Sequence, residues 1–225
     1  MRIVFFLFFI SFFFLSIAQD SSQPDDIYLE DQFYLGITYN FILNKPSDVT
    51  QRSLSYGLQG GFIKDLPINS TRTRAIGIGL GYAINSYYSN IRATESQGDI
   101  LYSRVGNDSD FKRSKIENHL IELPIEYRWR NSTPEEYKFW RIYTGVRLGY
   151  VFSGRSKFIS EGEKTSFSNN DLRKLQYGLT FNVGWNTFNI HIYYALSSLF
   201  NDSVALDNEM IEVKPLRVGF IFYIL

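Results

Sequence analysis

The sequence predicts an all-β protein, a single eight-stranded antiparallel up-and-down transmembrane β-barrel with a cleaved N-terminal signal peptide. Three observations predict this fold class. The chain begins with an export signal, its mature part contains eight segments in which apolar and polar residues alternate, and long and short connections alternate between those segments. Alternation with a period of two is typical of strands, and lipid outside with a polar lumen inside produces it in membrane barrels.

The first 18 residues have the layout of a secretory signal peptide. Met1 and Arg2 are followed by an almost continuous apolar run at residues 3–15. Small residues at Ser16 and Ala18 predict cleavage before Gln19. The run is too short for a retained spanning helix, which needs about 20 apolar residues. We therefore expect a signal peptide at residues 1–18, a polar periplasmic tail at 19–30 and the barrel at 31–225.

Composition excludes several classes of protein. Lysine plus arginine equals aspartate plus glutamate, 23 each, so the basic excess of a nucleic-acid-binding protein is missing. There is no cysteine, so the chain has neither disulfides nor the lipid-bearing cysteine of a lipoprotein. The aromatic content of 17% suits a barrel with aromatic belts at two membrane interfaces.

The hairpin at residues 119–150 shows the pattern most clearly. One face of its two segments is apolar and ends in tryptophans, whereas the other carries both signs of charge. By itself this hairpin fits a soluble barrel or sandwich equally well, and the export signal favours the membrane. The eight segments expected to be strands are 33–41, 54–62, 76–84, 119–129, 139–150, 175–185, 188–196 and 216–224.

The connections predict a topology. The longest, at residues 89–115, has no clear periodicity and is expected to be an outer loop, mobile or functional. A second polar loop is expected at 154–171, whereas the turn at 186–187 is short. An even number of strands places both termini in the periplasm. Apolar-face tryptophans beside the short turns predict a periplasmic aromatic girdle made of Trp129, Trp140 and Trp185.

The lumen-facing positions predict a structural charge network that closes the barrel to solutes. A turn centred near Thr133 and Pro134 would place Glu126 beside Arg141 and Glu122 beside Arg147. The alternating glycines of segment 76–84 would make room for long side chains. An eight-stranded barrel is just wide enough to be filled in this way. The network is predicted to contain Glu122, Glu126, Arg128, Arg141, Arg147 and Arg217.

No residue set predicts catalysis or a cofactor. His119 and His191 are the only histidines, so zinc sites of usual spacing cannot be assembled. Ser114 and His119 are the one pair that suggests an outer-leaflet hydrolase, but they lack the spacing of a triad. We expect a non-enzymatic protein with no catalytic residue, no metal, no cofactor and no small-molecule substrate.

The last strand resembles the signal that barrel-assembly machinery recognises. It has a polar residue, a glycine, an aromatic residue and a final hydrophobic residue in the usual order, with Leu225 one residue beyond the usual end. The assembly machinery and outer-membrane lipid are therefore expected partners. The residues of this predicted signal are Arg217, Gly219, Phe222 and Ile224.

Four segments of the chain are similar to the PorT-like family of outer-membrane barrels. They are EDQFYLGITYN at residues 30–40, YYSN at 87–90, LPIEYRWR at 123–130 and YKFWRIYTG at 137–145. The resemblance implies an accessory role in type IX protein secretion and gliding motility in Bacteroidetes, with other secretion-system proteins as partners and no catalytic residue. The alternative is a stand-alone surface barrel, an adhesin or ligand-binding protein that uses the loop at 89–115.

Overall fold

The computed structural model describes residues 31–51, 53–106, 111–131, 140–185, 188–206 and 209–224. The predicted signal peptide, the whole predicted periplasmic tail and the turn around Thr133 and Pro134 lie outside these ranges. Among the described residues no helix is long and apolar enough to cross a membrane.

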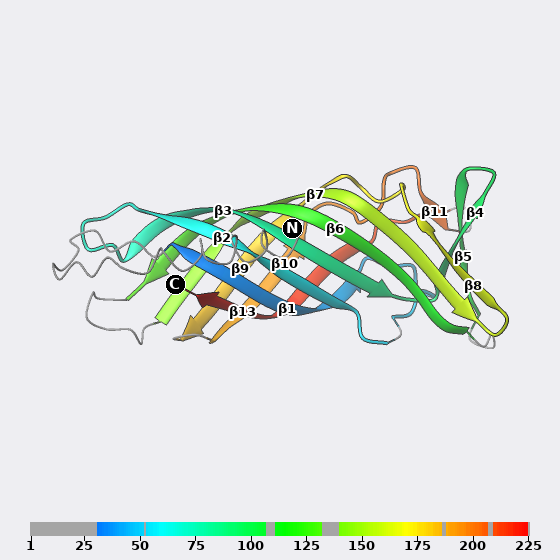
Figure 1. Ribbon diagram of the computed structural model, residues 1–225, viewed down its shortest axis with the longest axis horizontal. Coiled ribbons are helices and arrows are strands. Elements are labelled where there is room, and N and C mark those ends of the chain that lie inside the picture. Colours follow the sequence, from blue (N-terminus) through cyan, green and yellow to red (C-terminus); the bar gives the residue numbers. More distant parts are fainter. Residues whose placement is uncertain are drawn as a thin grey trace, which may run out of the picture.

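Eight antiparallel strands form a closed barrel, as the sequence predicts (Figure 1). Their order around the barrel is β6-β3-β2-β1-β13-β10-β9-β7, and β6 pairs with β7 to close it. The first and last strands pair directly, so both described ends of the chain lie at the same end of the barrel. The barrel strands are β1 (Gln32–Leu43), β2 (Tyr56–Pro67), β3 (Arg74–Tyr88), β6 (Phe111–Arg130), β7 (Trp140–Ser160), β9 (Leu175–Trp185), β10 (Phe188–Ala195) and β13 (Lys214–Ile224).

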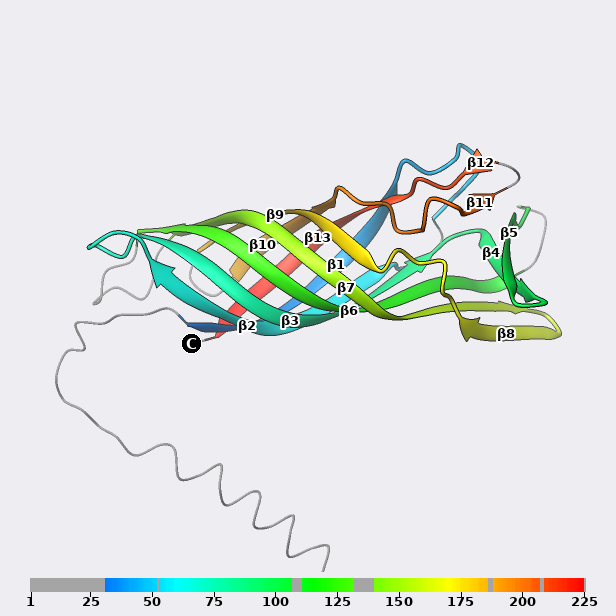
Figure 2. The same ribbon diagram turned by 90° about the horizontal axis from the view of Figure 1, so that it is seen from above.

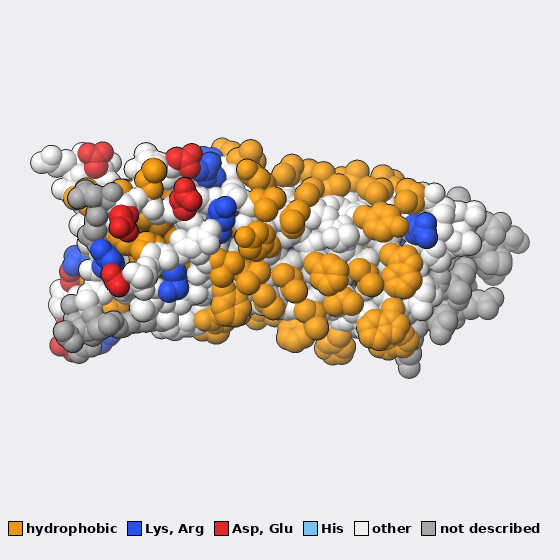
Figure 3. Space-filling view, turned by 180° about the vertical axis from the view of Figure 1, so that it is seen from behind, with side chains coloured by type: hydrophobic (Ala, Val, Ile, Leu, Met, Phe, Trp, Pro, Cys, Tyr) orange, Lys and Arg blue, Asp and Glu red, His pale blue; other side chains and the backbone are white. Residues whose placement is uncertain are grey.

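The barrel is apolar outside and polar inside, the reverse of a soluble protein. Large hydrophobic side chains such as Leu35, Leu80 and Phe188 are more than half exposed. On the face shown in Figure 3, hydrophobic side chains form a broad belt, and charged side chains gather beyond one edge of it. The largest fully buried side chains include three arginines, Arg128, Arg130 and Arg147. This arrangement is what a bilayer requires of a spanning barrel.

The end opposite the termini carries a folded unit, which we call the distal head (Figure 2). It consists of the projecting parts of β6 and β7, the strand β8 that continues the β7 sheet, and a small sheet in the order β12-β11-β5-β4. The small strands are β4 (Ile91–Ser96), β5 (Asp99–Arg104), β8 (Glu163–Ser168), β11 (Ala205–Leu206) and β12 (Glu209–Met210).

The expectation of irregular loops at 89–115 and 154–171 is wrong. Residues 91–104 form the β4–β5 hairpin, β6 begins already at Phe111, and β7 extends to Ser160 before turning into β8. Gln97 and Gly98 both have positive φ, 55° and 95°, which is the backbone of a tight two-residue hairpin turn. Gly162, with φ 82°, lies in the turn between β7 and β8.

The predicted register of the β6–β7 hairpin is also wrong. Glu126 lies opposite Gly145 and Glu122 opposite Gly149, whereas Arg141 lies opposite Arg130. The midpoint of the pairing therefore falls between residues 135 and 136, further along the chain than Thr133 and Pro134. Every barrel strand pairs on both sides, so closure of the whole barrel sets this register and the turn residues alone do not.

Candidate functional site

Glu122 is the centre of the charge cluster halfway along the lumen. One carboxylate oxygen lies 3.2 Å from Arg147 Nη1, and the other lies 3.1 Å from Arg217 Nη1, which reaches it from across the barrel. Arg147 also donates a hydrogen bond to Gln59, and Arg217 donates one to Asn85. All five side chains are buried. The negative charge of Glu122 thus compensates part of the positive charge of Arg147 and Arg217, which reach it from opposite walls of the barrel.

A second cluster lies nearer the terminus end. Arg128 Nε is 3.2 Å from the carboxylate of Glu126, and Arg128 Nη1 is 3.1 Å from Asp65. Asp65 also accepts a hydrogen bond from Arg130, at 2.8 Å. Arg128 packs over the ring of Tyr143, 4.5 Å from its centroid. Arg147 Nη2 lies 3.9 Å from Glu126, which brings the two clusters close together.

The sequence reading misses two members of this second cluster, Asp65 and Arg130. The segment that the sequence predicts as a strand, 54–62, ends before Asp65, so the predicted network does not include this carboxylate. In the structure β2 continues to Pro67, and its alternation places Asp65 in the lumen. The sequence pattern itself indicates this position, because the alternation of outward and inward residues continues past Phe62 and places Asp65 on the inward face. Arg141, expected beside Glu126, instead packs near the ring of Tyr223, 5.8 Å from its centroid.

Glycines on the inner face of β3 allow these long side chains to fit. A Cβ added to Gly77 would lie 2.7 Å from Arg128 Nε, and one added to Gly81 would lie 2.0 Å from Tyr34 Oη. Larger residues there would displace the cluster. Long side chains from other strands therefore reach the inner face of β3 at these two positions.

The histidines and Ser114 do not assemble a catalytic group. Ser114 is buried and donates a hydrogen bond to the carbonyl of Ile91, whereas His119 faces outward with its Nδ1 2.6 Å from Tyr82 Oη. His191 is buried in the lumen with its Nδ1 2.5 Å from Asn182 Oδ1. Within the described residues no group of three or more histidine, cysteine, aspartate or glutamate side chains could hold a metal ion.

The predicted girdle and assembly-signal residues take the following positions. Trp129, Trp140 and Trp185 are exposed near the terminus end, and the rings of Trp140 and Trp185 lie 5.3 Å apart. Arg217 belongs to the Glu122 cluster. A Cβ on Gly219 would lie 2.0 Å from the carbonyl oxygen of Ile37 on the neighbouring strand. Phe222 packs against Phe188 at 5.8 Å, and Ile224 is half exposed.

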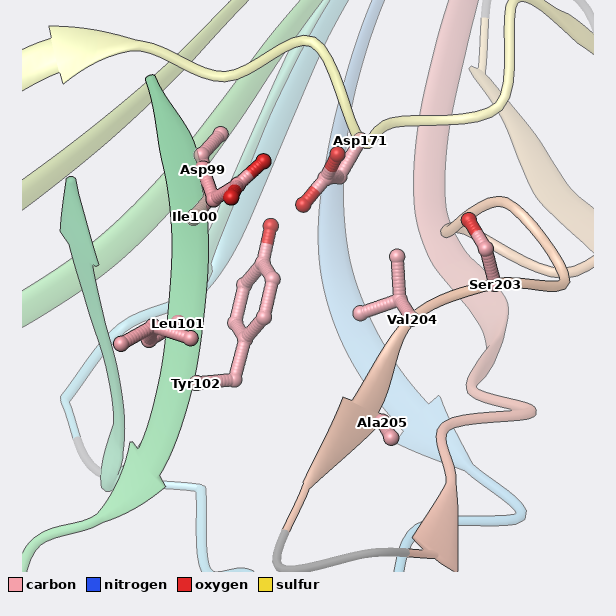
Figure 4. A pocket seen from close by; sticks show the side chains of 8 residues that line it. All are labelled: Asp99, Ile100, Leu101, Tyr102, Asp171, Ser203, Val204 and Ala205. Carbon is pink, nitrogen blue, oxygen red and sulfur yellow. The ribbon is translucent and has the colours of Figure 1, made fainter. Parts of the chain in front are cut away.

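The distal head contains an open pocket of about 750 Å³ between β5 and β11. The hydroxyl of Tyr102 points toward the space between the carboxylates of Asp99 and Asp171 (Figure 4). Burial raises the pKa of Tyr102 well above its usual range, so this hydroxyl stays protonated and donates a hydrogen bond to Oδ1 of Asn169 at 3.1 Å. The other lining residues are Ile100, Leu101, Ser203, Val204 and Ala205.

A hydrophobic core supports the head where the head strands meet the distal ends of the barrel strands. Phe200 and Tyr102 pack edge to face, with ring centroids 5.4 Å apart, and Leu172 and Leu206 are almost fully buried. The core draws on barrel strands and head strands alike, so the head is continuous with the barrel. Its buried residues are Ile42, Val49, Tyr87, Ile91, Ala93, Tyr102, Ile116, Leu172, Leu199, Phe200, Val204, Leu206, Ile211 and Val213.

Comparisons with known proteins relate this architecture to outer-membrane proteins. Two crystal structures of Ail, the attachment invasion locus protein of Yersinia pestis, are similar over 88% of this chain and 100% of theirs. Their TM-scores are 0.36 and 0.37 at 14% and 15% identity, the second in complex with the heparin analogue sucrose octasulfate. No curated protein matches the sequence. Residues 17–201 match the family described as Outer membrane protein beta-barrel domain, so this chain belongs to that family and is an outer-membrane β-barrel.

Proposed function

We propose that this protein is a non-enzymatic surface barrel that binds a ligand or partner through its distal head, with the head outside the cell and both termini in the periplasm. The folded head carries this proposal. Ordering polar outer loops costs roughly 1–2 kcal/mol per residue in backbone entropy, and burial of an apolar core offsets that cost. A rigid head suits recognition, because binding then requires little further ordering.

The other functions available to a small barrel are less well supported. A diffusion channel needs an open lumen, and the Glu122 and Arg128 clusters occupy it. A hydrolase needs a nucleophile next to its base. Ser114 faces inward and bonds to Ile91, whereas His119 faces outward and bonds to Tyr82. A binding role through the head remains the function that the geometry supports best.

The proposed orientation predicts which turns are accessible from outside. A peptide epitope inserted after Gly162, in the exposed β7–β8 turn, should bind antibody on intact cells. The same epitope inserted after Thr71, in the β2–β3 turn at the terminus end, should bind only after permeabilisation. Flow cytometry of both insertions decides the orientation, and the opposite labelling pattern would mean that the head faces the periplasm.

The pocket predicts a ligand with hydrogen-bond donors. Asp99 and Asp171 can accept hydrogen bonds from hydroxyl or ammonium groups, and the apolar lining residues can pack against the rest of the ligand. We expect Asp99→Asn with Asp171→Asn to weaken binding by at least tenfold, since a hydrogen bond to a charged group contributes about 1.5–3 kcal/mol. The measurement is binding of the detergent-solubilised barrel to arrays of glycans and lysine-rich peptides.

A matched control removes two exposed carboxylates elsewhere, Glu161→Gln with Glu212→Gln, and should leave binding unchanged. A wild-type barrel that binds no member of the arrays, or a pocket variant that binds as the wild type does, would contradict a role for this pocket.

A second candidate function is an accessory role in type IX secretion and gliding motility. The four segments that resemble the PorT-like family support it, and its partners would be other secretion-system proteins. A deletion strain separates the two candidates. Loss of export of other surface proteins favours the accessory role, whereas intact export with loss of surface binding favours the binding barrel.

A further inference from the structure

Outward-facing cations gather where β6, β7 and β8 leave the lipid belt. Lys115 on β6 lies directly opposite Lys157 on β7, and Lys157 in turn lies opposite Ser166 on β8. Figure 2 shows these three strands side by side as they enter the head. The polar side chains on this face, which we call the cationic face, are Arg113, Lys115, Glu117, Arg155, Lys157, Lys164, Ser166 and Ser168.

The positive charge of the cationic face is largely unbalanced. Glu117 is its one carboxylate in the described part of the chain, and it is held by Lys115 at 2.5 Å and Ser86 at 2.7 Å. Arg155 lies directly opposite Glu117 in the β6–β7 pairing, but Arg155, Lys157 and Lys164 form no ion pair with a carboxylate of the described residues. Lys115 therefore has a counter-ion in Glu117, whereas Lys157, directly opposite Lys115 on the neighbouring strand, has none, and a bound anion would supply one.

The position of the cationic face indicates where that anion comes from. Phe152 and Tyr150, about half exposed, are the last large apolar residues of β7 in the belt. Arg155 follows three residues later, which places it roughly 8 Å further along the membrane normal for a tilted strand. The head-group layer adds several ångströms on each side of a hydrocarbon core of about 30 Å. Arg155 therefore lies at head-group height, and the long Lys157 side chain can reach down to it.

We propose that the cationic face binds the phosphate groups of anionic membrane lipids. The guanidinium of Arg155 and the ammonium of Lys157 would contact the phosphate oxygens, and the hydroxyls of Ser166 and Ser168 would add hydrogen bonds. Below them, Tyr82, His119 and Phe152 form an aromatic cluster that packs beside the acyl chains. This proposal needs only the outer-membrane location and is independent of what the head pocket binds.

The test measures lipid retention by native mass spectrometry of the complete mature barrel in detergent. With phosphatidylglycerol and zwitterionic phosphatidylcholine titrated separately, we expect tighter retention of phosphatidylglycerol by about tenfold or more. Arg155→Gln with Lys157→Gln should remove most of that preference, and raised salt should weaken it in the wild type. These side chains face outward, so the variant should keep the gel migration of the folded barrel.

The control removes an exposed positive charge from the β1–β2 connection of the head, Lys45→Gln, and should keep the preference. Equal retention of the two lipids by the wild type would overturn the proposal, as would an unchanged preference in the Arg155 and Lys157 variant. Inorganic phosphate is added as a competitor. If it displaced phosphatidylglycerol completely at equal concentration, the face would be a site for free anions and not for lipid head groups.

Discussion

Replacing Glu122 with glutamine should lower the free energy of unfolding of the barrel by about 3–5 kcal/mol. Glu122 is 1% exposed and is the carboxylate that joins Arg147 and Arg217. Without it, two guanidinium groups from opposite walls face each other in a buried space, and the desolvation cost of both is no longer offset. The measurement is the temperature, or urea concentration, at which the barrel loses its folded migration on gels.

A double-mutant cycle isolates the contact itself. Arg147→Met alone should also destabilise, and adding it to Glu122→Gln should cost less than the sum of the two single losses, because the repelling guanidinium has gone. Glu161→Gln, in the exposed β7–β8 turn, is the control and should change stability by no more than about 0.5 kcal/mol. Additive losses would show that Glu122 and Arg147 do not interact.

Replacing Phe200 with alanine should unfold the distal head and leave the membrane barrel intact. Phe200 is 1% exposed and packs against Tyr102 at the centre of the head core. Removing a buried phenylalanine side chain costs about 3–5 kcal/mol, because the cavity that remains only partly collapses. The barrel strands keep their own backbone pairing below the head. We expect rapid proteolysis of the β4–β5 hairpin in the variant and slow proteolysis in the wild type.

Leu101 provides the matched control, because it lies in the β4–β5 hairpin whose proteolysis is measured and its side chain is 61% exposed. Leu101→Ala should leave the rate of proteolysis close to that of the wild type. If Phe200→Ala also abolished the folded migration of the barrel, the head and the barrel would form a single cooperative unit. Equal protection of both variants would show that the core does not hold the head together.

Local alternation was enough to predict which faces of the barrel strands meet lipid. Leu35, Leu80 and Trp140 alternate with polar or small residues, and the structure exposes all three. The same rule would have found Asp65, because the strand simply continues past Phe62. The hairpin turn at Gln97 and Gly98 was harder to recognise, since the strands on either side are only six residues long and their apolar residues contact distant parts of the chain.

The alternation of apolar and polar residues does not predict contacts between residues that are far apart in the sequence. Arg217 lies on the last strand and meets Glu122 on β6 across the lumen, a pairing that depends on strand order, stagger and barrel diameter. The register of β6 against β7 shifted from the expected one for the same reason, because each strand must also match its other neighbour.

The sequence alone predicted an export signal, and it determined that the chain forms eight amphipathic strands and that arginines and glutamates face a lumen. These features are predictable because successive side chains of a strand point to opposite faces, so the polarity of each residue indicates whether it faces lipid or the lumen. Only the tertiary structure decided which charges meet and that the connections at the end opposite the termini form a head around Phe200 and Tyr102. The charge contacts and the head core both depend on packing between segments that are far apart in the chain. A pattern within one segment does not determine that packing.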